Sequence, residues 1–165
     1  MARQCSGVYS RMMFADTDLA PTIWNNPAGV FAQLSGSWSL TRTLSTGASM
    51  TGEAIFTPRN DGALAYRETG KLQLPSGQTF DADRRYIYRG TDDGFSVFFA
   101  EQSEELFHRI VLHGVDGVLC GHAHHPCRAD IYLSRYEFRR DRSFTLVHDV
   151  SGPTKNYQSQ TLFRR

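Results

Sequence analysis

The chain has few cysteines for its length. Only three occur among 165 residues, Cys5, Cys120 and Cys127. Small secreted domains that depend on disulfides carry a denser and usually even set, whereas intracellular compartments keep thiols reduced. The sequence therefore argues against a disulfide framework. It predicts a protein of a reducing compartment, and the cytoplasm is the expected location.

Long hydrophobic runs are also absent. No stretch approaches the ~18 consecutive apolar residues of a membrane span, and the first residues, MARQCSGVYSRMMF, contain no apolar core of a secretion signal. We therefore expect a soluble protein without a membrane partner. A mitochondrial location is the minor alternative: Arg3, Arg11 and several serines are typical of a transit peptide, but the acidic Asp16 and Asp18 follow closely.

Neither sign of charge dominates the chain. Eighteen basic residues face 17 acidic ones. Proteins that bind nucleic acids or anionic membrane surfaces through electrostatics carry a clear basic excess. The balance therefore predicts no nucleic-acid partner and leaves a small molecule as the expected one, while the oligomeric state is left open.

The length of the chain fits one domain. A sequence of 165 residues buries a substantial core but is short for two ordinary domains, and it shows no linker and no internal repeat. We expect a partly irregular N-terminal extension over residues 1–25 and a single domain over residues 26–165.

Helical patterns are scarce. Only NPAGVFAQLSG, from Asn26 to Gly36, predicts a helix. Asn26 is a favourable N-cap, Pro27 suits the first turn, and Gly36 tolerates the positive φ that often ends a helix. The sequence predicts one short helix near the start of the domain.

From about residue 36 onward, apolar and polar residues alternate in short runs separated by Gly, Asp, Asn and Pro. In SWSLTRTL, Trp38, Leu40, Arg42 and Leu44 share one face, because successive side chains of a strand point to opposite sides. We count eight to ten such strands. Closing them on themselves removes exposed edges. The predicted fold is all-β: a closed or nearly closed antiparallel up-and-down barrel of eight to ten strands with a short N-terminal helix.

A family resemblance supports this fold. The short helix that leads into FAQLSGSWSLTR resembles the Gly-x-Trp entry of the calycin superfamily, with Phe31, Gly36 and Trp38 in the matching places. In that superfamily an arginine of the last strand commonly packs across the tryptophan ring. Arg164 or Arg165 is the residue that the resemblance points to here.

The longer segments GSWSLTRTL, FHRIVL, HPCRADIYLSRYEF and VSGPTKNYQSQTLFRR together resemble a family of unknown function, made of small calycin-like (lipocalin-like) β-barrel proteins. The similarity runs from about Phe31 to the C-terminus. The family pattern His-x-Cys-x-x-Asp-x-Tyr is matched by four residues: His125, Cys127, Asp130 and Tyr132. The family's Lys-Asp-Tyr reads Lys155-Asn156-Tyr157 here, without the carboxylate. The resemblance implies a fold and no particular activity.

Two arginines fall on the expected inner face. A guanidinium inside a barrel needs a carboxylate or an anionic ligand to replace its lost hydration. For Arg42 we expect an ion pair, and the candidate partners are Glu53, Glu68, Asp81 and Asp83. In DADRRYIYRG, alternation favours Arg84, Tyr86 and Tyr88 as inward, with Arg85 and Ile87 inward as the alternative.

His108, in ELFHRIVL, shares its expected inner face with Leu106, Ile110 and Leu112. A histidine among such neighbours is either a core residue with one hydrogen-bond partner or a donor that lines a pocket. Both interpretations remain open from the sequence.

The stretch GHAHHPCRADIYLSRY is rich in residues that carry chemistry. His122 and His124 project from one face of a strand, while His125 points to the other unless a bulge forms near Pro126. His122, His124 and Cys127 form a zinc-site alternative, although their spacing differs from the common paired ligands. His125, Cys127, Asp130 and Tyr132 converge only if the chain bends between Pro126 and Arg128.

Together these patterns predict a protein that binds a small, partly apolar ligand with an anionic or carbonyl group inside the barrel. The candidate ligand-binding residues are Trp38, Arg42, Arg84, Tyr86, His108, His125, Cys127, Asp130, Tyr132, Lys155 and Tyr157. One alternative is an enzyme that uses His108 or His125 with Asp130 in acid–base chemistry, and another is a barrel that binds haem or a metal. No cofactor is assigned, and whether the protein is an enzyme is left open.

Overall fold

The structure is a computed structural model, and it describes Trp24, residues 26–101 and residues 105–165. The extension predicted over residues 1–25 lies outside the described residues except for Trp24. The described residues contain one helix, α1, which spans Pro27–Leu34. The side chain of its N-cap Asn26 accepts a hydrogen bond from the Gly29 amide at 2.7 Å, and Gly36 follows with a φ of 111°. The predicted start and stop signals of the helix are confirmed.

Ten strands follow the helix, and each pairs with its neighbours in sequence. Their bounds are β1 Gly36–Leu44, β2 Ser49–Pro58, β3 Leu64–Gln73, β4 Thr79–Thr91, β5 Gly94–Phe99, β6 Leu106–Val115, β7 Val118–Cys127, β8 Asp130–Phe138, β9 Phe144–Ser151 and β10 Asn156–Arg164. The sheet closes where β1 pairs antiparallel with β10, from Ser39 opposite Arg164 to Leu44 opposite Ser159. The predicted closed antiparallel up-and-down barrel is confirmed.

The alternation in β1 shows why the sheet has a distinct inside. Trp38, Leu40 and Arg42 are buried, whereas the residues between them are exposed. The same two-residue period recurs in the neighbouring strands, so that aromatic and aliphatic side chains fill the lumen. The barrel therefore encloses its core within a single wrapped sheet.

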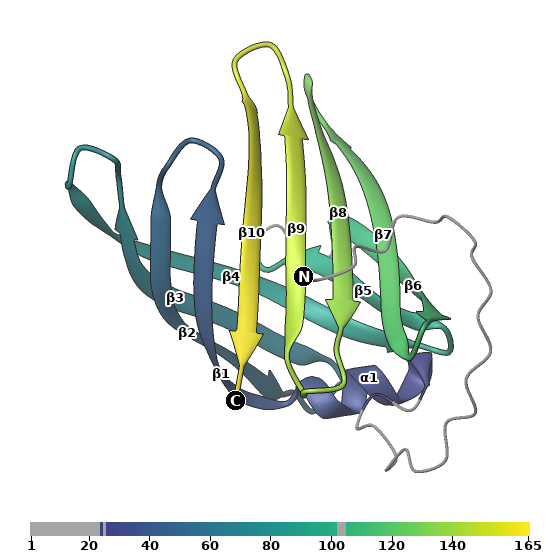
Figure 1. Cartoon of the computed structure of the whole chain (residues 1–165). Helices are drawn as coiled ribbons and strands as arrows, with labels where there is room; N and C mark the ends of the chain where they lie inside the picture. The colour runs from purple at the N-terminus through teal and green to yellow at the C-terminus, as the bar shows by residue number, and fades with distance from the viewer. Residues whose placement is uncertain (1–23, 25, 102–104) are drawn as a thin grey trace.

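The helix α1 covers one end of the barrel, at the bottom of Figure 1, where it packs against β4, β5 and β6. Trp38 lies at this end, and its Nε1 donates a hydrogen bond to the Leu34 carbonyl at 2.8 Å. Trp24 stacks nearby on Trp38, with ring centroids 6.2 Å apart. At the opposite end the hairpins extend beyond the core without a covering helix (Figure 1). The two ends of the barrel thus differ, and this difference positions the cavity described below.

The one β-bulge in the strand pairings of the described residues lies at a different place from the one expected from the sequence. The strand β7 continues through Pro126, and its register with β8 is unbroken from Leu119 opposite Phe138 to Cys127 opposite Asp130. The bulge considered near Pro126 is therefore absent from this pairing. A bulge occurs instead between β5 and β6, where the register shifts between Val97 and Phe98.

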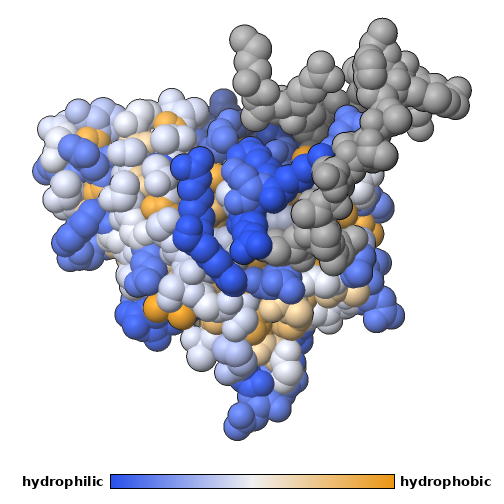
Figure 2. Space-filling view, turned by 60° about the horizontal axis from the view of Figure 1, so that its bottom comes forward, coloured by the Kyte–Doolittle hydropathy of each residue, from blue (hydrophilic) through white to orange (hydrophobic). Residues whose placement is uncertain are grey.

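The outer surface is mainly polar. In Figure 2, where the helix end is turned forward, hydrophobic residues appear singly or in small groups among hydrophilic ones. The large hydrophobic side chains exposed on the described part of the chain are Ile55, Phe80, Leu106, Val115, Ile131 and Leu133. Its one helix, α1, has only eight residues and is too short to cross a membrane.

Candidate functional site

A cavity of ≈270 Å³ occupies the end of the barrel that faces away from α1. Leu44 at the end of β1 and Cys127 at the end of β7 both line it, which places it among the strand ends remote from the helix. The lining side chains are Arg42, Leu44, Met50, Glu68, Leu72, Ala82, Asp83, Arg84, Tyr86, Phe99, Phe107, His125, Cys127, Tyr132, His148, Val150, Tyr157 and Ser159. The lining combines aromatic and aliphatic surface with a small polar set.

Aromatic rings form one wall of the cavity, centred on Phe107. The ring of Tyr86 stacks parallel to Phe107 with centroids 5.7 Å apart. Phe99 and His125 lie at 5.0 and 5.1 Å from the same ring, and Tyr132 meets it edge-on at 6.0 Å. Such offset and edge-to-face contacts favour a well-defined arrangement of rings. The wall therefore offers a preformed surface for a planar apolar group.

The bulge between β5 and β6 explains why Phe107 belongs to this wall. Val97 pairs with His108 and Phe98 pairs with Leu106, so Phe107 is the extra residue of β6. Phe107 and His108 are consequently both buried, while Leu106 is 46% exposed. The expectation that Leu106 points inward with His108 was wrong, because the bulge changes the facing of the strand at this point.

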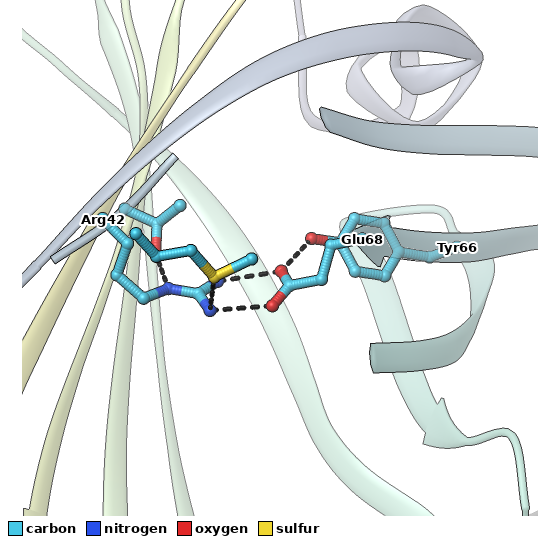
Figure 3. Close-up of polar contacts among 5 residues, drawn as sticks. Arg42, Tyr66 and Glu68 are labelled. Carbon is cyan, nitrogen blue, oxygen red and sulfur yellow. Dashed lines mark hydrogen bonds and ion pairs between the residues drawn. The ribbon is translucent and has the colours of Figure 1, made fainter. Parts of the chain in front are cut away.

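A buried ion pair between β1 and β3 also lines the cavity. Arg42 donates from both terminal nitrogens to the Glu68 carboxylate, at 2.7 and 2.8 Å. Its Nε donates to Thr161 Oγ1 at 2.7 Å, and the Tyr66 hydroxyl donates to Glu68 at 2.5 Å (Figure 3). Of the four carboxylates considered as partners for Arg42, Glu68 is the one that the structure pairs with it.

The pKa shifts of this pair follow from its neighbours. Burial alone would raise the pKa of Glu68, but the hydrogen bonds and charge of Arg42, with the Tyr66 hydroxyl, outweigh burial and lower it. Burial alone would lower the pKa of Arg42, and Glu68 reverses that effect and raises it. Both groups are therefore charged at neutral pH and satisfy one another.

Arg84 is the second arginine that lines the cavity, and unlike the buried Arg42 it is exposed. It lines the cavity on the same face of β4 as Tyr86 and the buried Tyr88, which confirms the predicted facing of this strand. No ion pair joins Arg84 to a carboxylate within the described residues, whereas its neighbours Asp83 and Arg85 pair with each other on the outside. Glu68 is opposite Arg84 in the pairing of β3 and β4, but within the described residues its carboxylate forms its ion pair with Arg42 and not with Arg84.

His108 lies deeper than the cavity lining. Its Nε2 is 3.2 Å from the Tyr136 hydroxyl, which is in turn 3.2 Å from the Tyr88 hydroxyl. Its Nδ1 is buried without a hydrogen-bond partner. Burial, together with His148 and His125, lowers the pKa of His108 to about 3. The ring is therefore neutral at physiological pH. Its position fits the interpretation as a core residue with one hydrogen-bond partner, which Nε2 has in Tyr136 and Nδ1 lacks.

His148 lines the cavity directly. Its Nδ1 lies 2.8 Å from the Ser134 hydroxyl. Burial, followed by the charges of Arg84 and Arg42, lowers the pKa of His148 to about 4. This residue was not selected from the sequence. The signal that could have selected it was a polar residue at an inward position between Leu146 and Val150.

The β7–β8 hairpin brings together the family pattern. A two-residue turn at Arg128 and Ala129 connects the strands, and Arg128 has a φ of 57°. Because His125 is opposite Tyr132 and Cys127 is opposite Asp130, the members of both pairs point to the same side. The four side chains therefore converge because of the hairpin turn at Arg128 and Ala129. This turn lies one residue further along the chain than the bend expected between Pro126 and Arg128.

Asp130 does not reach the cavity lining. Its carboxylate forms an ion pair with Lys155 at 2.7 Å at the rim. That pairing raises the pKa of the Lys155 ammonium. Within the described residues no hydrogen bond joins an imidazole to a carboxylate, so the arrangement considered for acid–base chemistry, with Asp130 orienting His108 or His125, is not formed.

The residues of the zinc-site alternative are separated. His122 and His124 are exposed, whereas Cys127 faces the cavity with His125. Since side chains two apart share a face and those three apart do not, the sheet lies between the two histidines and the thiol. In the described ranges, no cluster of three or more His, Cys, Asp or Glu residues could hold a metal ion.

The cavity gathers part of the predicted ligand-binding set. Arg42, Arg84, Tyr86, His125, Cys127, Tyr132 and Tyr157 line it, and Trp38, His108, Asp130 and Lys155 do not. Trp38 lies at the helix-covered end, on the other side of the core. The lining residues that sequence reasoning did not select are mostly apolar, with Glu68, His148 and Ser159 among the polar ones.

The family model for the family of unknown function DUF6314 matches residues 34–165. The chain belongs to this family. The match covers the barrel from the end of α1 to the C-terminus. No curated protein matches the chain.

Solved structures similar to the chain include designed barrels. A redesigned β-barrel, mFAP1, bound to DFHBI is 15% identical, with 85% of this chain and 100% of the other covered and a TM-score of 0.41. A de novo designed fluorescence-activating β-barrel is 14% identical, with 82% and 96% covered and a TM-score of 0.41. A third, the redesigned barrel b11L5F_LGL, is 13% identical, with 85% and 96% covered and a TM-score of 0.42.

Proposed function

We propose that the protein binds a small, partly apolar molecule in the open-ended cavity of the barrel. The observation that carries this proposal is the cavity itself: ≈270 Å³ of space lined by aromatic rings and a few placed polar groups. Ligand pockets of proteins span roughly 300–1,000 Å³ and share this mixed lining. The ligand is accordingly small, about the size of two or three aromatic rings.

The distribution of polar groups supports binding over simple core packing. A barrel that serves only as a scaffold is usually filled by its own side chains. Here the helix-covered half is filled by aromatic residues such as Trp38, Phe138 and Phe144, whereas the other half keeps empty space. Polar side chains, among them Arg42, Glu68 and His148, line this empty space.

The proposal is tested by filling the cavity. Ala82 lines it, and Ala82→Trp places a large ring in the space that a ligand would occupy. Ala32→Trp is the matched control, since Ala32 is exposed on α1 at the other end of the barrel. Native mass spectrometry of the purified full chain reports any copurified molecule, and the uncharged fluorophore N-phenyl-1-naphthylamine reports binding directly.

We expect the fluorophore to bind the unmodified protein and Ala32→Trp equally, and to bind Ala82→Trp at least about tenfold more weakly, because the space is filled. Circular dichroism verifies that both variants are folded. Equal binding by all three proteins, or no binding by any of them together with no copurified molecule, would overturn the proposal.

A further inference from the structure

One imidazole of the cavity has two nitrogens with different surroundings. His148 Nδ1 is held by the Ser134 hydroxyl at 2.8 Å. No hydrogen bond engages Nε2 within the described residues, and Nε2 is not among the buried atoms that lack a partner, which are Trp24 Nε1 and His108 Nδ1. Since His148 lines the cavity, Nε2 is the ring nitrogen that is open to it.

The buried serine determines which nitrogen carries the proton. Ser134 is 2% exposed, and the bond to His148 is the one hydrogen bond of its hydroxyl within the described residues. If the hydroxyl accepted from Nδ1–H, its own hydrogen would have no acceptor, which is unfavourable in a buried site. A hydroxyl that donates to Nδ1 avoids this cost and leaves the hydrogen on Nε2.

The neutral state of the ring agrees with this assignment. Burial and the nearby charges of Arg84 and Arg42 lower the pKa of His148 to about 4. At neutral pH the imidazole therefore carries one N–H. Because the N–H of Nε2 is directed into the cavity, a ligand bound there needs a hydrogen-bond acceptor to pair with it.

The charges around the cavity specify the acceptor further. Arg42 and Glu68 neutralise each other through two hydrogen bonds. Arg84 lines the same space and forms no salt bridge within the described residues, since the carboxylate of Glu68, opposite it across β3 and β4, is bound by Arg42. Asp83, which also borders the cavity, is engaged by Arg67 on the outer face. With Asp83 held by Arg67, the groups that line the cavity carry one excess positive charge, that of the exposed Arg84, and an anionic ligand would neutralise it.

We propose that the cavity binds a small aromatic oxyanion of the carboxylate class, whose negative group accepts a hydrogen bond from His148 Nε2 and pairs with Arg84. The aromatic body packs against the wall formed by Phe107 and Tyr86. Ser134 is a positioning residue, which acts by fixing the His148 tautomer. This inference rests on the proposed function and names the class of ligand for the same cavity.

Two fluorescent probes of similar shape separate the contribution of charge from that of apolar contact. Anilinonaphthalene sulfonate carries an oxyanion, with its sulfonate standing for a carboxylate, and N-phenyl-1-naphthylamine lacks it. We expect the unmodified protein to bind the sulfonate probe about tenfold more tightly than the neutral one, the effect of one hydrogen bond to a charged group. Arg84→Gln is expected to remove that preference, because it removes the charge that pairs with the sulfonate.

Arg85→Gln is the matched control, because Arg85 is the adjacent residue of β4 and points outward. His148→Phe is expected to reduce the preference as Arg84→Gln does, whereas His148→Gln, which retains an N–H donor, preserves part of it. For Ser134→Ala we expect a reduced preference and a change in the ¹⁵N chemical shifts of His148, from a ring protonated at Nε2 to a mixture of tautomers. A purely structural serine would leave those shifts unchanged.

The outcomes distinguish the two proposals. If the neutral probe does not bind, or binds unaffected by Ala82→Trp, the proposed function itself fails. If the neutral probe binds in the cavity but the sulfonate probe binds no more tightly, or if Arg84→Gln and His148→Phe leave the preference unchanged, the assignment of an oxyanion is overturned and cavity binding stands.

Discussion

The guanidinium of Arg165 lies 4.4 Å from the centroid of the Trp38 ring. The same side chain donates hydrogen bonds to the carbonyls of Gln33 and Ser35, at 2.7 and 2.5 Å, just where α1 ends. Arg165, the residue that follows β10, thus connects the end of α1 to β1. The contact covers the tryptophan and satisfies two carbonyls that a helix end leaves without partners.

Arg165→Ala is expected to destabilise the barrel by about 1–2 kcal/mol, since it removes a cation–π contact and two hydrogen bonds at a partly exposed site. Arg165→Lys is expected to retain part of that stability, because an ammonium keeps the charge but not the planar fork. Urea unfolding followed by tryptophan fluorescence measures both. Arg164→Ala is the control, as Arg164 is exposed and makes no cation–π contact with a ring of the described residues. Equal stability of the Arg164 and Arg165 variants would contradict this role.

The Arg42–Glu68 pair leads to a second prediction. Arg42→Met leaves the Glu68 carboxylate buried with only the Tyr66 hydroxyl, and the loss of one partner from a buried pair costs about 3–5 kcal/mol. Arg42→Met combined with Glu68→Leu is expected to cost less than Arg42→Met alone, because no unpaired charge remains. Denaturant unfolding of the single and double variants gives the coupling free energy.

The exposed pair of Arg67 and Asp83 supplies the comparison for this cycle. It joins the neighbouring strands β3 and β4, whereas Arg42 and Glu68 lie on β1 and β3, and both of its side chains are exposed. A coupling below about 1 kcal/mol is expected there. If the coupling free energy of the buried pair is no larger than that of this exposed pair, burial does not strengthen the coupling between Arg42 and Glu68.

The sequence predicted the regular part of the barrel well, since alternation has a direct structural meaning in an unbroken strand. Trp38, Leu40 and Arg42 point inward as expected. The same rule failed at Leu106, because one inserted residue reverses the facing of the strand and no residue type in ELFHRIVL marks the insertion. Phe107, the centre of the aromatic wall, was missed for this reason.

The composition of the site was harder to predict than its scaffold. The partner of Arg42 depends on which strands are neighbours and on their register, and four carboxylates satisfied the sequence criteria equally. Cys127 and Asp130 share a face only because the β7–β8 turn has two residues. His148 forms its hydrogen bond with Ser134 across paired strands. These relationships are set by strand pairing, which alternation alone does not fix.

The buried histidines predict a strong pH dependence of stability. In the unfolded chain His108 and His148 take up protons near their ordinary pKa of 6.5, whereas in the folded barrel they do so only near about 3 and about 4. Between these limits the unfolded state binds more protons, so stability falls as the pH falls. Two such residues reduce the free energy of unfolding by up to about 2.7 kcal/mol per pH unit below pH 6.

Urea unfolding between pH 8 and pH 5 measures this dependence. We expect a plateau above about pH 7 and a decline below it. His108→Phe removes one of the two buried imidazoles and is expected to halve the slope, while His113→Phe, at an exposed position of the same strand, leaves it unchanged. A free energy of unfolding that stays constant from pH 7 to pH 5 would show that neither imidazole is held neutral by burial.

The last prediction concerns Phe107, the extra residue of the bulge. Its ring lies between the cavity and His108, with centroids 4.4 Å apart, and it contacts several other rings of the wall. Phe107→Ala should cost about 3–5 kcal/mol of stability, because the surrounding strands cannot collapse into the vacated space. Phe80→Ala is the matched control: this phenylalanine is 50% exposed, so we expect a change within about 0.5 kcal/mol.

The larger cavity of Phe107→Ala is also expected to bind toluene, which would raise its melting temperature by more than that of the unmodified protein. Equal costs for the two alanine variants, with no added effect of toluene, would mean that the Phe107 ring does not fill space in the wall of the cavity.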